Sequence, residues 1–433
     1  MKTAALHNLG CKVNSYETEA MREMLENAGY KIVDFHDVAD VYVINTCSVT
    51  NMADRKSRQM LHRAKKQNPD AIVVGCGCYV QTSEKEALAD TAVDIIIGND
   101  KKHELVDLIE EFEKNRTEID AVIDINEKGR EFETLHLSEQ SEHSRAFIKV
   151  QDGCNQFCSY CIIPFARGRV RSRQLNDILD EVSRMTEKGY SEFVLSGIHL
   201  SSYGVDSGAS LITLIEAVAA IEKVERIRLG SFEPMVVTED FVKRLAEVKK
   251  VCPHFHLSLQ SGCDGTLKRM NRRYTSAQFK EKCDLFRKYF DNPALTTDVI
   301  VGFPGETDEE FEETKKFLDS VHFYELHVFK YSKRKGTVAA GMKDQIDEKI
   351  KTERSAVLIK KADEMSEEFR QSYLNKDVEV LVEEKVKILN KEYGIGFTKE
   401  YIKVAIPSGQ CEIGDIIIGK PVSKLKDDIY LLA

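Results

Sequence analysis

The chain has 433 residues, of which 42% are hydrophobic and 31% charged, so it is neither a collagen-like nor a disordered protein. Its net charge of −10 excludes a uniformly basic nucleic-acid coat but is compatible with a local basic face. No apolar run approaches the roughly 18 residues of a membrane span, and the first residues lack the apolar core of a signal peptide. We therefore expect a cytoplasmic protein with no membrane partner, in which the 11 cysteines are ligands, catalytic thiols or core residues rather than disulfides.

Residues 1–125 alternate between strand and helix patterns, which is typical of a mainly parallel sheet with helices on its faces. Apolar runs rich in β-branched residues predict strands over Thr3–His7, Val41–Asn45, Ala71–Val74 and Val93–Ile97. Apolar residues at helical spacing predict helices over Thr18–Ala28 and Asp54–Lys66. The sequence is charged and irregular over residues 111–144, and we assign residues 126–144 as a linker.

Residues 145–370 alternate again, and the pattern predicts six strand–helix units. The predicted strands are Ala146–Val150, Glu192–Leu195, Arg226–Leu229, His256–Leu259, Thr297–Val301 and Glu325–Phe329. Six units are too few for an eight-fold barrel and indicate an open, partial (β/α)6 barrel, in which chemistry lies at the carboxyl ends of the strands. A charged helix over about Asp347–Tyr373 then packs against this domain through apolar residues at helical spacing.

Residues 371–433 change to short β runs punctuated by glycines, which favours a small β-barrel. The chain is therefore predicted to be an α/β protein of three domains: a parallel α/β sheet, a partial barrel and a small β-barrel.

Three cysteines with C-x3-C-x2-C spacing, Cys154, Cys158 and Cys161, directly follow the first strand of the predicted partial barrel. Three thiolates on one loop can hold three irons of a [4Fe–4S] cluster, which leaves one iron open to a small molecule. The alternatives are a zinc site or buried free thiols. Structural zinc usually takes four ligands, and no fourth cysteine or histidine lies nearby in the sequence.

A second set of cysteines, Cys11, Cys47 and Cys78, follows three predicted strands of the first domain. Because the carboxyl ends of parallel strands lie at one edge of a sheet, we expect these thiols to converge there and hold a second cluster with one open iron. The remaining cysteines match no ligand pattern and are interpreted as structural: Cys76, Cys252, Cys263, Cys283 and Cys411.

The cysteine spacing at the head of a (β/α)6 pattern resembles the radical S-adenosylmethionine (SAM) superfamily over residues 145–335. The resemblance implies that the open iron chelates SAM and that an electron from a low-potential donor cleaves it to a 5′-deoxyadenosyl radical. Glycine permits close backbone approach to a ligand, so we expect Gly197 and Gly302 to line the SAM site. Many members have Gly-Gly-Glu after the second strand, where this chain has Ser196-Gly197-Ile198; Glu233 is expected to bind the SAM amine instead.

The sequences around the first three cysteines are similar to motifs of the methylthiotransferase family. They are Leu9-Gly10-Cys11-Lys12-Val13-Asn14, Asn45-Thr46-Cys47-Ser48 and Gly77-Cys78-Tyr79-Val80-Gln81. The family pattern selects Cys78 rather than Cys76, and the carboxy-terminal barrel resembles the RNA-binding TRAM domain. The resemblance implies two [4Fe–4S] clusters, with SAM as both methyl donor and radical source. One SAM is expected to methylate a sulfur on the Cys11/Cys47/Cys78 cluster, and that sulfur comes from a separate sulfur source. The radical formed from a second SAM then removes hydrogen from an aromatic C–H bond, and the methylthio group takes its place. Such a bond is not acidic enough for general-base catalysis, so the cofactor carries the hard step.

The substrate expected from the resemblance is C2 of N6-threonylcarbamoyladenosine at position 37, in a tRNA anticodon stem-loop. This expectation depends on Lys12-Val13-Asn14 and Ser231-Phe232-Glu233-Pro234, which are most like the threonylcarbamoyl type. The alternatives are isopentenyladenosine, a ribosomal-protein aspartate, or, in other functional classes, a two-cluster electron-transfer protein or a zinc-dependent RNA-binding module.

An RNA substrate requires cations near the site, because phosphate contacts supply much of the affinity. Four arginines, Arg167, Arg169, Arg171 and Arg173, lie just after the C-x3-C-x2-C loop and are expected to bind the RNA. Two further basic runs, residues 268–273 and 330–335, follow predicted strands four and six. The carboxy-terminal 63 residues hold nine lysines and ten acidic residues, so any RNA contact there needs a local patch.

Overall fold

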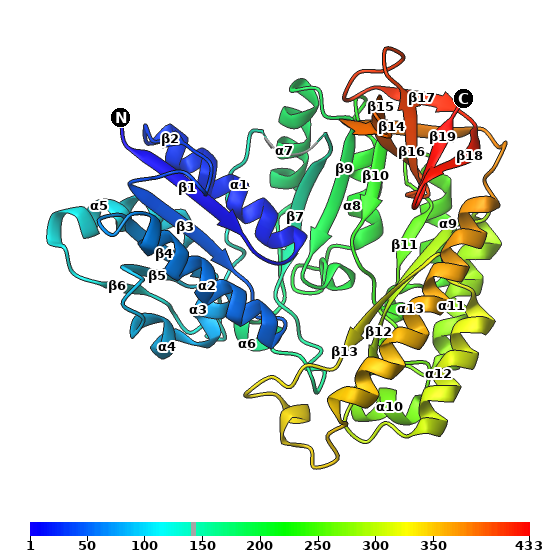
Figure 1. Cartoon of the computed structure of the whole chain (residues 1–433), viewed down its shortest axis with the longest axis horizontal. Coiled ribbons are helices and arrows are strands. Elements are labelled where there is room, and N and C mark those ends of the chain that lie inside the picture. The colour runs from blue at the N-terminus through cyan, green and yellow to red at the C-terminus, as the bar shows by residue number, and fades with distance from the viewer. Residues whose placement is uncertain (140–143) are drawn as a thin grey trace.

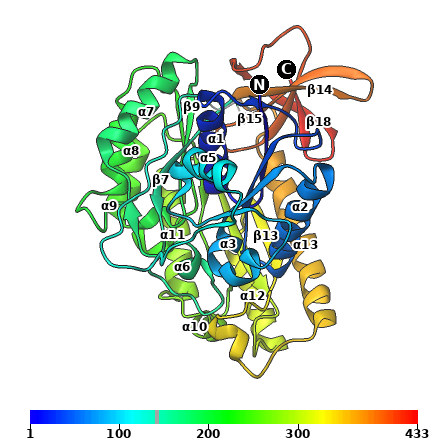
Figure 2. The same cartoon turned by 90° about the vertical axis from the view of Figure 1, so that its left-hand side faces the viewer.

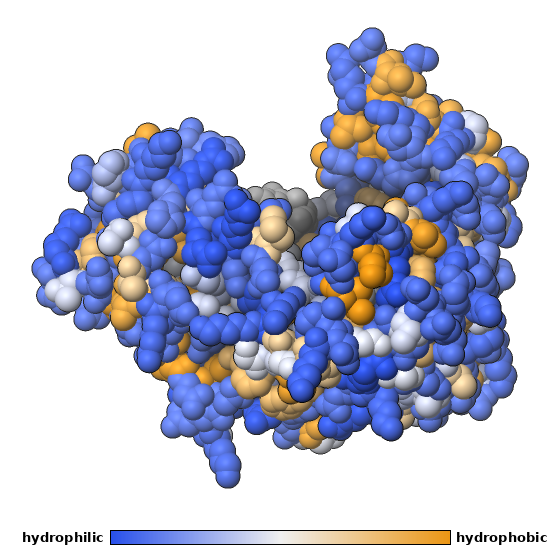
Figure 3. Space-filling model, turned by 60° about the horizontal axis from the view of Figure 1, so that its bottom comes forward, coloured by the Kyte–Doolittle hydropathy of each residue, from blue (hydrophilic) through white to orange (hydrophobic). Residues whose placement is uncertain are grey.

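The computed structural model describes residues 1–139 and 144–433 and arranges them as an amino-terminal α/β sheet, a central partial barrel and a carboxy-terminal β-sheet (Figure 1). No helix of the described residues is both long and apolar enough to cross a membrane. The face shown in Figure 3 is mainly hydrophilic, and its apolar side chains are scattered in small groups.

The amino-terminal sheet has six parallel strands in the order β2-β1-β3-β4-β5-β6. Their bounds are β1 Thr3–Asn8, β2 Lys31–Ile32, β3 Val41–Thr46, β4 Ile72–Gly77, β5 Ile95–Ile97 and β6 Ile119–Ala121. Helices α1 (Lys12–Asn27) and α5 (Leu105–Asn115) pack on one face, and α2 (Asn51–Gln67) and α3 (Cys78–Thr82) on the other. Between α3 and β5 lies α4 (Glu84–Leu88). Strand β3 is wholly buried because helices cover both faces of the sheet. Strands in such a position need continuous apolar runs.

The prediction that the chain becomes irregular at residue 111 is wrong. Helix α5 continues to Asn115, and β6 then adds an edge strand to the sheet. The acidic residues that suggested a linker lie on the outer side of α5, whereas Leu105, Leu108 and Phe112 are buried at helical spacing. The pattern is therefore that of an amphipathic helix, which the many charged residues of its outer side made look irregular.

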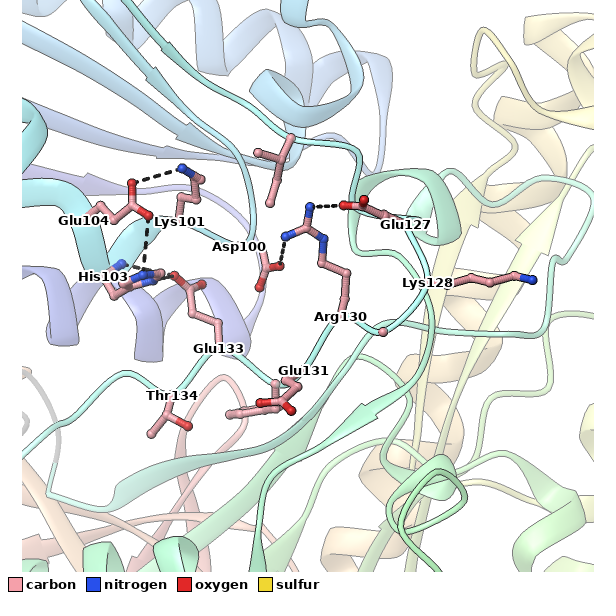
Figure 4. A pocket seen from close by; sticks show the side chains of 13 residues that line it. Asp100, Lys101, His103, Glu104, Glu127, Lys128, Arg130, Glu131, Glu133 and Thr134 are labelled. Carbon is pink, nitrogen blue, oxygen red and sulfur yellow. Dashed lines mark hydrogen bonds and ion pairs between the residues drawn. The ribbon is translucent and has the colours of Figure 1, made fainter.

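The segment after β6 packs against the amino-terminal domain rather than hanging free. Glu133 Oε1 is hydrogen-bonded to His103 Nδ1 (3.0 Å), and Arg130 lies 3.7 Å from Asp100 (Figure 4). These charged groups line a cleft of about 640 Å³ that contains none of the cysteines. The predicted linker 126–144 lies partly outside the described residues, and its bounds stay a prediction.

The central domain has six parallel strands that follow one another in chain order, β7-β9-β10-β11-β12-β13, as predicted. They are β7 Ala146–Asp152, β9 Glu192–Gly197, β10 Arg226–Leu229, β11 His254–His256, β12 Ala294–Val301 and β13 Glu325–Lys330. Parallel bridges Ile227↔Val251 and Phe232↔Leu257 join β10 to the next strand. A short antiparallel strand, β8 (Arg171–Ser172), pairs with β7.

Helices cover the outside of these strands, and the result is an open (β/α)6 barrel (Figures 1 and 2). They are α7 Leu175–Glu187, α8 Leu211–Ala219, α9 Glu239–Glu247, α11 Ser276–Tyr289 and α12 Asp308–Val321, with short α6 Ile163–Ala166 and α10 Asp264–Arg269 in loops. Strand β11 ends earlier than predicted. The chain makes only isolated bridges after His256, and Gln260 has a φ of 68°, which breaks the pleat.

The long helix α13 (Glu348–Gln371) packs along β13 and leads into a six-stranded sheet in the order β17-β14-β15-β16-β19-β18. The strands are β14 Val378–Ile388, β15 Lys391–Thr398, β16 Lys403–Pro407, β17 Ile416–Gly419, β18 Pro421–Lys426 and β19 Ile429–Leu432. The two outer strands, β17 and β18, are halves of one bent segment interrupted only at Lys420. The sheet therefore curls on itself, which agrees with the predicted small barrel.

Candidate active site

The C-x3-C-x2-C loop begins immediately after β7, at the carboxyl end of the barrel strands. The amide of Cys154 donates to the carbonyl of Gly168 (3.0 Å), and a tight turn joins Cys158 to Cys161 through an N–H···O bond of 2.9 Å. Ser159 ties the loop to the end of α10, because its hydroxyl donates to the carbonyl of Arg269 (2.7 Å). These hydrogen bonds hold all three thiols on one loop.

Polar side chains from three other strand ends converge on this loop. Arg272 Nη1 donates to Cys158 Sγ (3.2 Å), and Gln156 Nε2 donates to Glu233 Oε2 (2.7 Å). His199 Nε2 lies 3.3 Å from the same carboxylate oxygen, and Arg272 lies 3.6 Å from the other. Burial alone would raise the pKa of Glu233, but its contacts with His199 and Arg272 lower it. Glu233 is therefore an anion beside the cysteine loop.

The two glycines expected to line the SAM site, Gly197 and Gly302, approach protein atoms rather than open space. A Cβ on Gly197 would come 2.8 Å from Gln151 Oε1, so this glycine allows β9 to pack against β7. Gly302, with a φ of 68°, packs against the aliphatic part of Lys351 from α13. Its missing side chain is thus explained by helix packing, which does not support the expected SAM contact.

The second set of cysteines lies at neighbouring strand ends of the amino-terminal sheet. Cys11 follows β1 and caps α1, Cys47 follows β3, and Cys78 follows β4 as the first residue of α3. Strands β1, β3 and β4 are adjacent, so the three thiols share one edge. A Cβ on Gly10 would come 3.0 Å from Cys47 Sγ, which shows how closely the first two loops pack. Cys76 instead points into the core and contacts Met21 and the carbonyl of Ile44.

Burial raises the pKa of most of these thiols above the ordinary value of 9.0. The pKa of Cys47 rises to about 11, that of Cys154 to about 11 and that of Cys161 to about 12, with further contributions from neighbouring thiols. Burial also raises the pKa of Cys11. A bound cation or cluster is needed to hold such thiols as thiolates at neutral pH.

The donor sets suit an iron–sulfur cluster better than a single zinc ion. Thiolates on one zinc lie about 3.8 Å apart, given Zn–S bonds of about 2.3 Å. Among the described residues, the one group of three potential ligands within 4.8 Å contains no cysteine. Neither set of three sulfurs therefore lies wholly within 4.8 Å, and N–H groups of Arg272 and Gln156 donate to sulfurs of the first set, as is common around iron–sulfur clusters.

Arg167, which was expected to bind RNA, is instead completely buried between the two sets of cysteines. Its Nε donates to Cys78 Sγ (3.4 Å), and its two Nη atoms form a bidentate pair with Glu17 and reach Asp152 and Asn14. Burial would raise the pKa of Glu17, but the charge of Arg167 and of neighbouring lysines holds it well below its ordinary value. The arginine is thus an interior cation that connects the amino-terminal sheet to the barrel.

Two further arginines of this run are also buried, which corrects the expectation for the run as a whole. Arg171 lies 3.8 Å from Asp152, and Arg173 forms a 2.5 Å ion pair with Glu181; each is 3% exposed. Arg169 alone of the four is exposed, and it stacks on Phe157 of the cysteine loop at 4.5 Å. A run with many arginines suggests a surface exposed to solvent. In this run the buried arginines are instead paired with acidic residues that other elements of the fold supply.

Each of the other two basic runs also contains some cations that are paired within the protein and others that are exposed. Arg269 pairs with Glu310, and Arg334 crosses to the amino-terminal domain, where it contacts Asp54 (2.6 Å) and Ser48 (2.7 Å) next to Cys47. Lys268, Arg273, Lys333 and Lys335 remain exposed. The contacts of Arg272 and Arg334 with the cysteine loops were not predicted, because only tertiary structure separates structural from solvent-facing cations within a run.

Comparison with known proteins agrees with this geometry. The model of the Radical SAM superfamily matches residues 148–318, and that described as Uncharacterized protein family UPF0004 matches residues 3–98. The chain is 42% identical to the threonylcarbamoyladenosine tRNA methylthiotransferase MtaB of Bacillus subtilis over 96% of this chain and 93% of the relative. It is 40% identical to the protein of the same name from Aquifex aeolicus, over 90% and 95% of the two chains.

Relatives with a different named substrate are almost as similar. The tRNA-2-methylthio-N(6)-dimethylallyladenosine synthase of Acetivibrio thermocellus is 37% identical, over 88% of this chain and 81% of the relative. Among solved structures, the radical SAM methyltransferase TsrM of Kitasatospora setae has a TM-score of 0.56 at 14% identity, over 76% and 75% of the two chains. That likeness concerns the fold alone.

Proposed function

The chain belongs to the radical SAM methylthiotransferase family of tRNA-modifying enzymes, and from this premise we propose that it attaches a methylthio group to C2 of N6-threonylcarbamoyladenosine at tRNA position 37. The proposal assigns Cys154, Cys158 and Cys161 to the cluster that binds SAM, and Cys11, Cys47 and Cys78 to a second [4Fe–4S] cluster.

The observation that carries this proposal is the position of Arg167 between the two sets of cysteines. Its Nε donates to Cys78, while the carbonyl of the next residue, Gly168, accepts from the amide of Cys154. One short segment therefore contacts a cysteine of each set. A reaction that uses both cofactors on one nucleoside needs the two sets close together.

When bound, SAM and the two clusters supply the radical that opens the C–H bond and the methylthio group that replaces the hydrogen. The residues of the chain hold and orient these groups. Arg272 donates to Cys158 Sγ and holds it in place, and we assign Glu233 to the ammonium of SAM because it is an anion beside that loop. Arg167 and Asn99 both donate to Cys78 Sγ and orient it in the same way.

The anticodon stem-loop is proposed to bind across the exposed cations of the rim. Arg169 remains from the predicted arginine run, and Lys268, Arg273 and Lys333 are exposed in the other two basic segments. Contacts from these side chains to phosphate are largely independent of sequence, so the identity of the modified adenosine is read elsewhere. A low-potential electron donor and a sulfur source complete the proposed set of partners.

The experiment that tests this function measures iron and product in the same samples. Anaerobically reconstituted wild-type protein is compared with Cys78→Ala and Cys158→Ala, using a tRNA that carries threonylcarbamoyladenosine. We expect each variant to lose about half of the iron. Cys78→Ala should still cleave SAM to 5′-deoxyadenosine, whereas Cys158→Ala should not, and neither should form the methylthio product. Full iron content in Cys78→Ala would contradict the second cluster.

A further inference from the structure

Three polar side chains form a compact group inside the barrel that no assigned role uses. His256 of β11, Asp298 of β12 and His327 of β13 lie on adjacent parallel strands, and their ligand-type atoms are all within 4.8 Å of one another. His256 Nε2 is 3.3 Å from Asp298 Oδ2, and the two imidazoles stack with centroids 5.6 Å apart. His327 is exposed and the Asp298 side chain is 28% exposed, so a ligand can reach the group.

A hydrogen bond to the Nδ1 atom of His256 fixes the orientation of its ring. His256 Nδ1 shares a 2.9 Å hydrogen bond with Thr296 Oγ1, so its Nε2 points toward Asp298. In the part of the chain that the structure describes, this buried Nε2 has no hydrogen-bond partner of adequate geometry. Asp298 and His327 are partly open to solvent, whereas their neighbours Val299 and Leu326 belong to the core between strands and helices. The group therefore faces the interior of the barrel, with unused hydrogen-bonding capacity.

This interior lies between the two sets of cysteines. Ser258 is two residues beyond His256, and its carbonyl accepts from Arg272, which also contacts Cys158. On the other side, Lys12 directly follows Cys11, and its charge acts on His327, whose pKa is lowered by burial first and then by His256 and Lys12. None of the ion pairs found among the described residues includes Lys12. Lys12 is thus an exposed cation beside the second set of cysteines, with no partner among those ion pairs.

We propose that His256, Asp298 and His327, together with Lys12 next to Cys11, recognise the polar exocyclic group of the modified adenosine. This inference rests on the proposed function and deepens it. A threonylcarbamoyl group offers a carboxylate for Lys12, a hydroxyl and ureido N–H groups for Asp298, and acceptors for the imidazoles. An isopentenyl group offers none of these and would cover the four polar side chains without pairing them, so the site selects against it.

The test compares the binding of anticodon stem-loops that differ only at position 37. Fluorescence anisotropy with SAM-loaded holoenzyme measures stem-loops carrying threonylcarbamoyladenosine, isopentenyladenosine or unmodified adenosine. We expect wild-type protein to prefer the threonylcarbamoyl form, and Asp298→Asn and His327→Ala to reduce that preference by about 10-fold or more. Binding of the unmodified stem-loop should not change, because phosphate contacts supply it. His62→Ala is the matched control, since His62 makes a similar pair with Asp90 at 3.0 Å on the outer surface.

Two results would overturn the inference while leaving the proposed function intact. One is an unchanged preference in both variants. The other is one equivalent of a divalent metal other than iron in the wild-type holoenzyme that is lost in His327→Ala, because two histidines and a carboxylate also suit such an ion. A wild-type enzyme that methylthiolates only isopentenyladenosine would overturn the proposed substrate and the inference together. Asp298→Asn keeps the shape of the side chain, so a folding defect in His327→Ala alone would not decide the outcome.

Discussion

Arg167 Nε lies 3.4 Å from Cys78 Sγ, inside a molecule in which the two residues come from different domains. The guanidinium is fully buried and paired with Glu17, so it is held in place independently of any cluster. Hydrogen bonds to cysteine sulfur tune the reduction potential of a cluster. The contact therefore links domain docking to the electronic state of the proposed second site.

Arg167→Lys is expected to keep the charge but to lose the bidentate pair and the N–H···S bond. We expect a loss of about 2–3 kcal/mol in the free energy of unfolding and a changed EPR spectrum of the reduced second cluster. The matched control is Arg173→Lys, which breaks a similarly buried pair with Glu181 but contacts no cysteine. An identical EPR spectrum in Arg167→Lys would show that the contact does not affect the cluster.

Gly10→Ala is expected to reduce iron binding at the second site specifically. Gly10 has a φ of 111°, and a Cβ there would press on Cys47 Cβ and Sγ at 2.9 and 3.0 Å. Gly29→Ala provides the control, because Gly29 has a φ of 87° but nothing within 4 Å of the added Cβ. Both variants should be destabilised by about 1–2 kcal/mol through backbone strain. Iron analysis should show a loss in Gly10→Ala only; equal iron in both would contradict the packing argument.

Cys76→Ala is expected to retain both clusters, since Cys76 is fully buried against Met21 and Ile44. The variant should lose about 1 kcal/mol in the free energy of unfolding because a small cavity forms, while its iron content and product yield match those of the wild type. Loss of half the iron would show that Cys76, and not only Cys78, belongs to the ligand set.

Cluster assembly is expected to become more favourable as pH rises from 7 to 9. Burial raises the pKa of Cys47 and Cys154 to about 11 and that of Cys161 to about 12, so each thiol must release a proton on binding iron. For the same reason the cluster-free protein keeps its stability below pH 9 and loses it as pH rises toward 11–12, because the unfolded thiols ionise first. Proton release in weak buffer during reconstitution measures the effect, and pH-independent assembly without proton release would contradict it.

The elements that the sequence predicted well are those whose pattern is local. The barrel strands follow from their apolar runs, and α12 begins at a capping box of Thr307 and Glu310, a hydroxyl and a carboxylate three residues apart in the sequence. The placement of Cys11, Cys47 and Cys78 at one sheet edge also follows, because strand ends of a parallel sheet lie together.

The burial of Arg167 was not predictable from its neighbours along the chain. Its partner Glu17 is 150 residues away, on a helix of another domain. The same holds for Arg334, whose contact with Asp54 joins positions 280 residues apart. Likewise, the group formed by His256, Asp298 and His327 requires the register of three strands, which no single segment encodes. Local composition can thus identify chemistry-bearing residues without telling which of them face each other.

The most direct test of the central claim is mass spectrometry of tRNA nucleosides from cells that lack the gene and carry wild-type, Cys78→Ala or Cys158→Ala protein. The account predicts the 2-methylthio form of threonylcarbamoyladenosine with wild-type protein and only unthiolated threonylcarbamoyladenosine with either variant. Methylthio product in cells that carry Cys78→Ala, or a change confined to isopentenyladenosine, would contradict it.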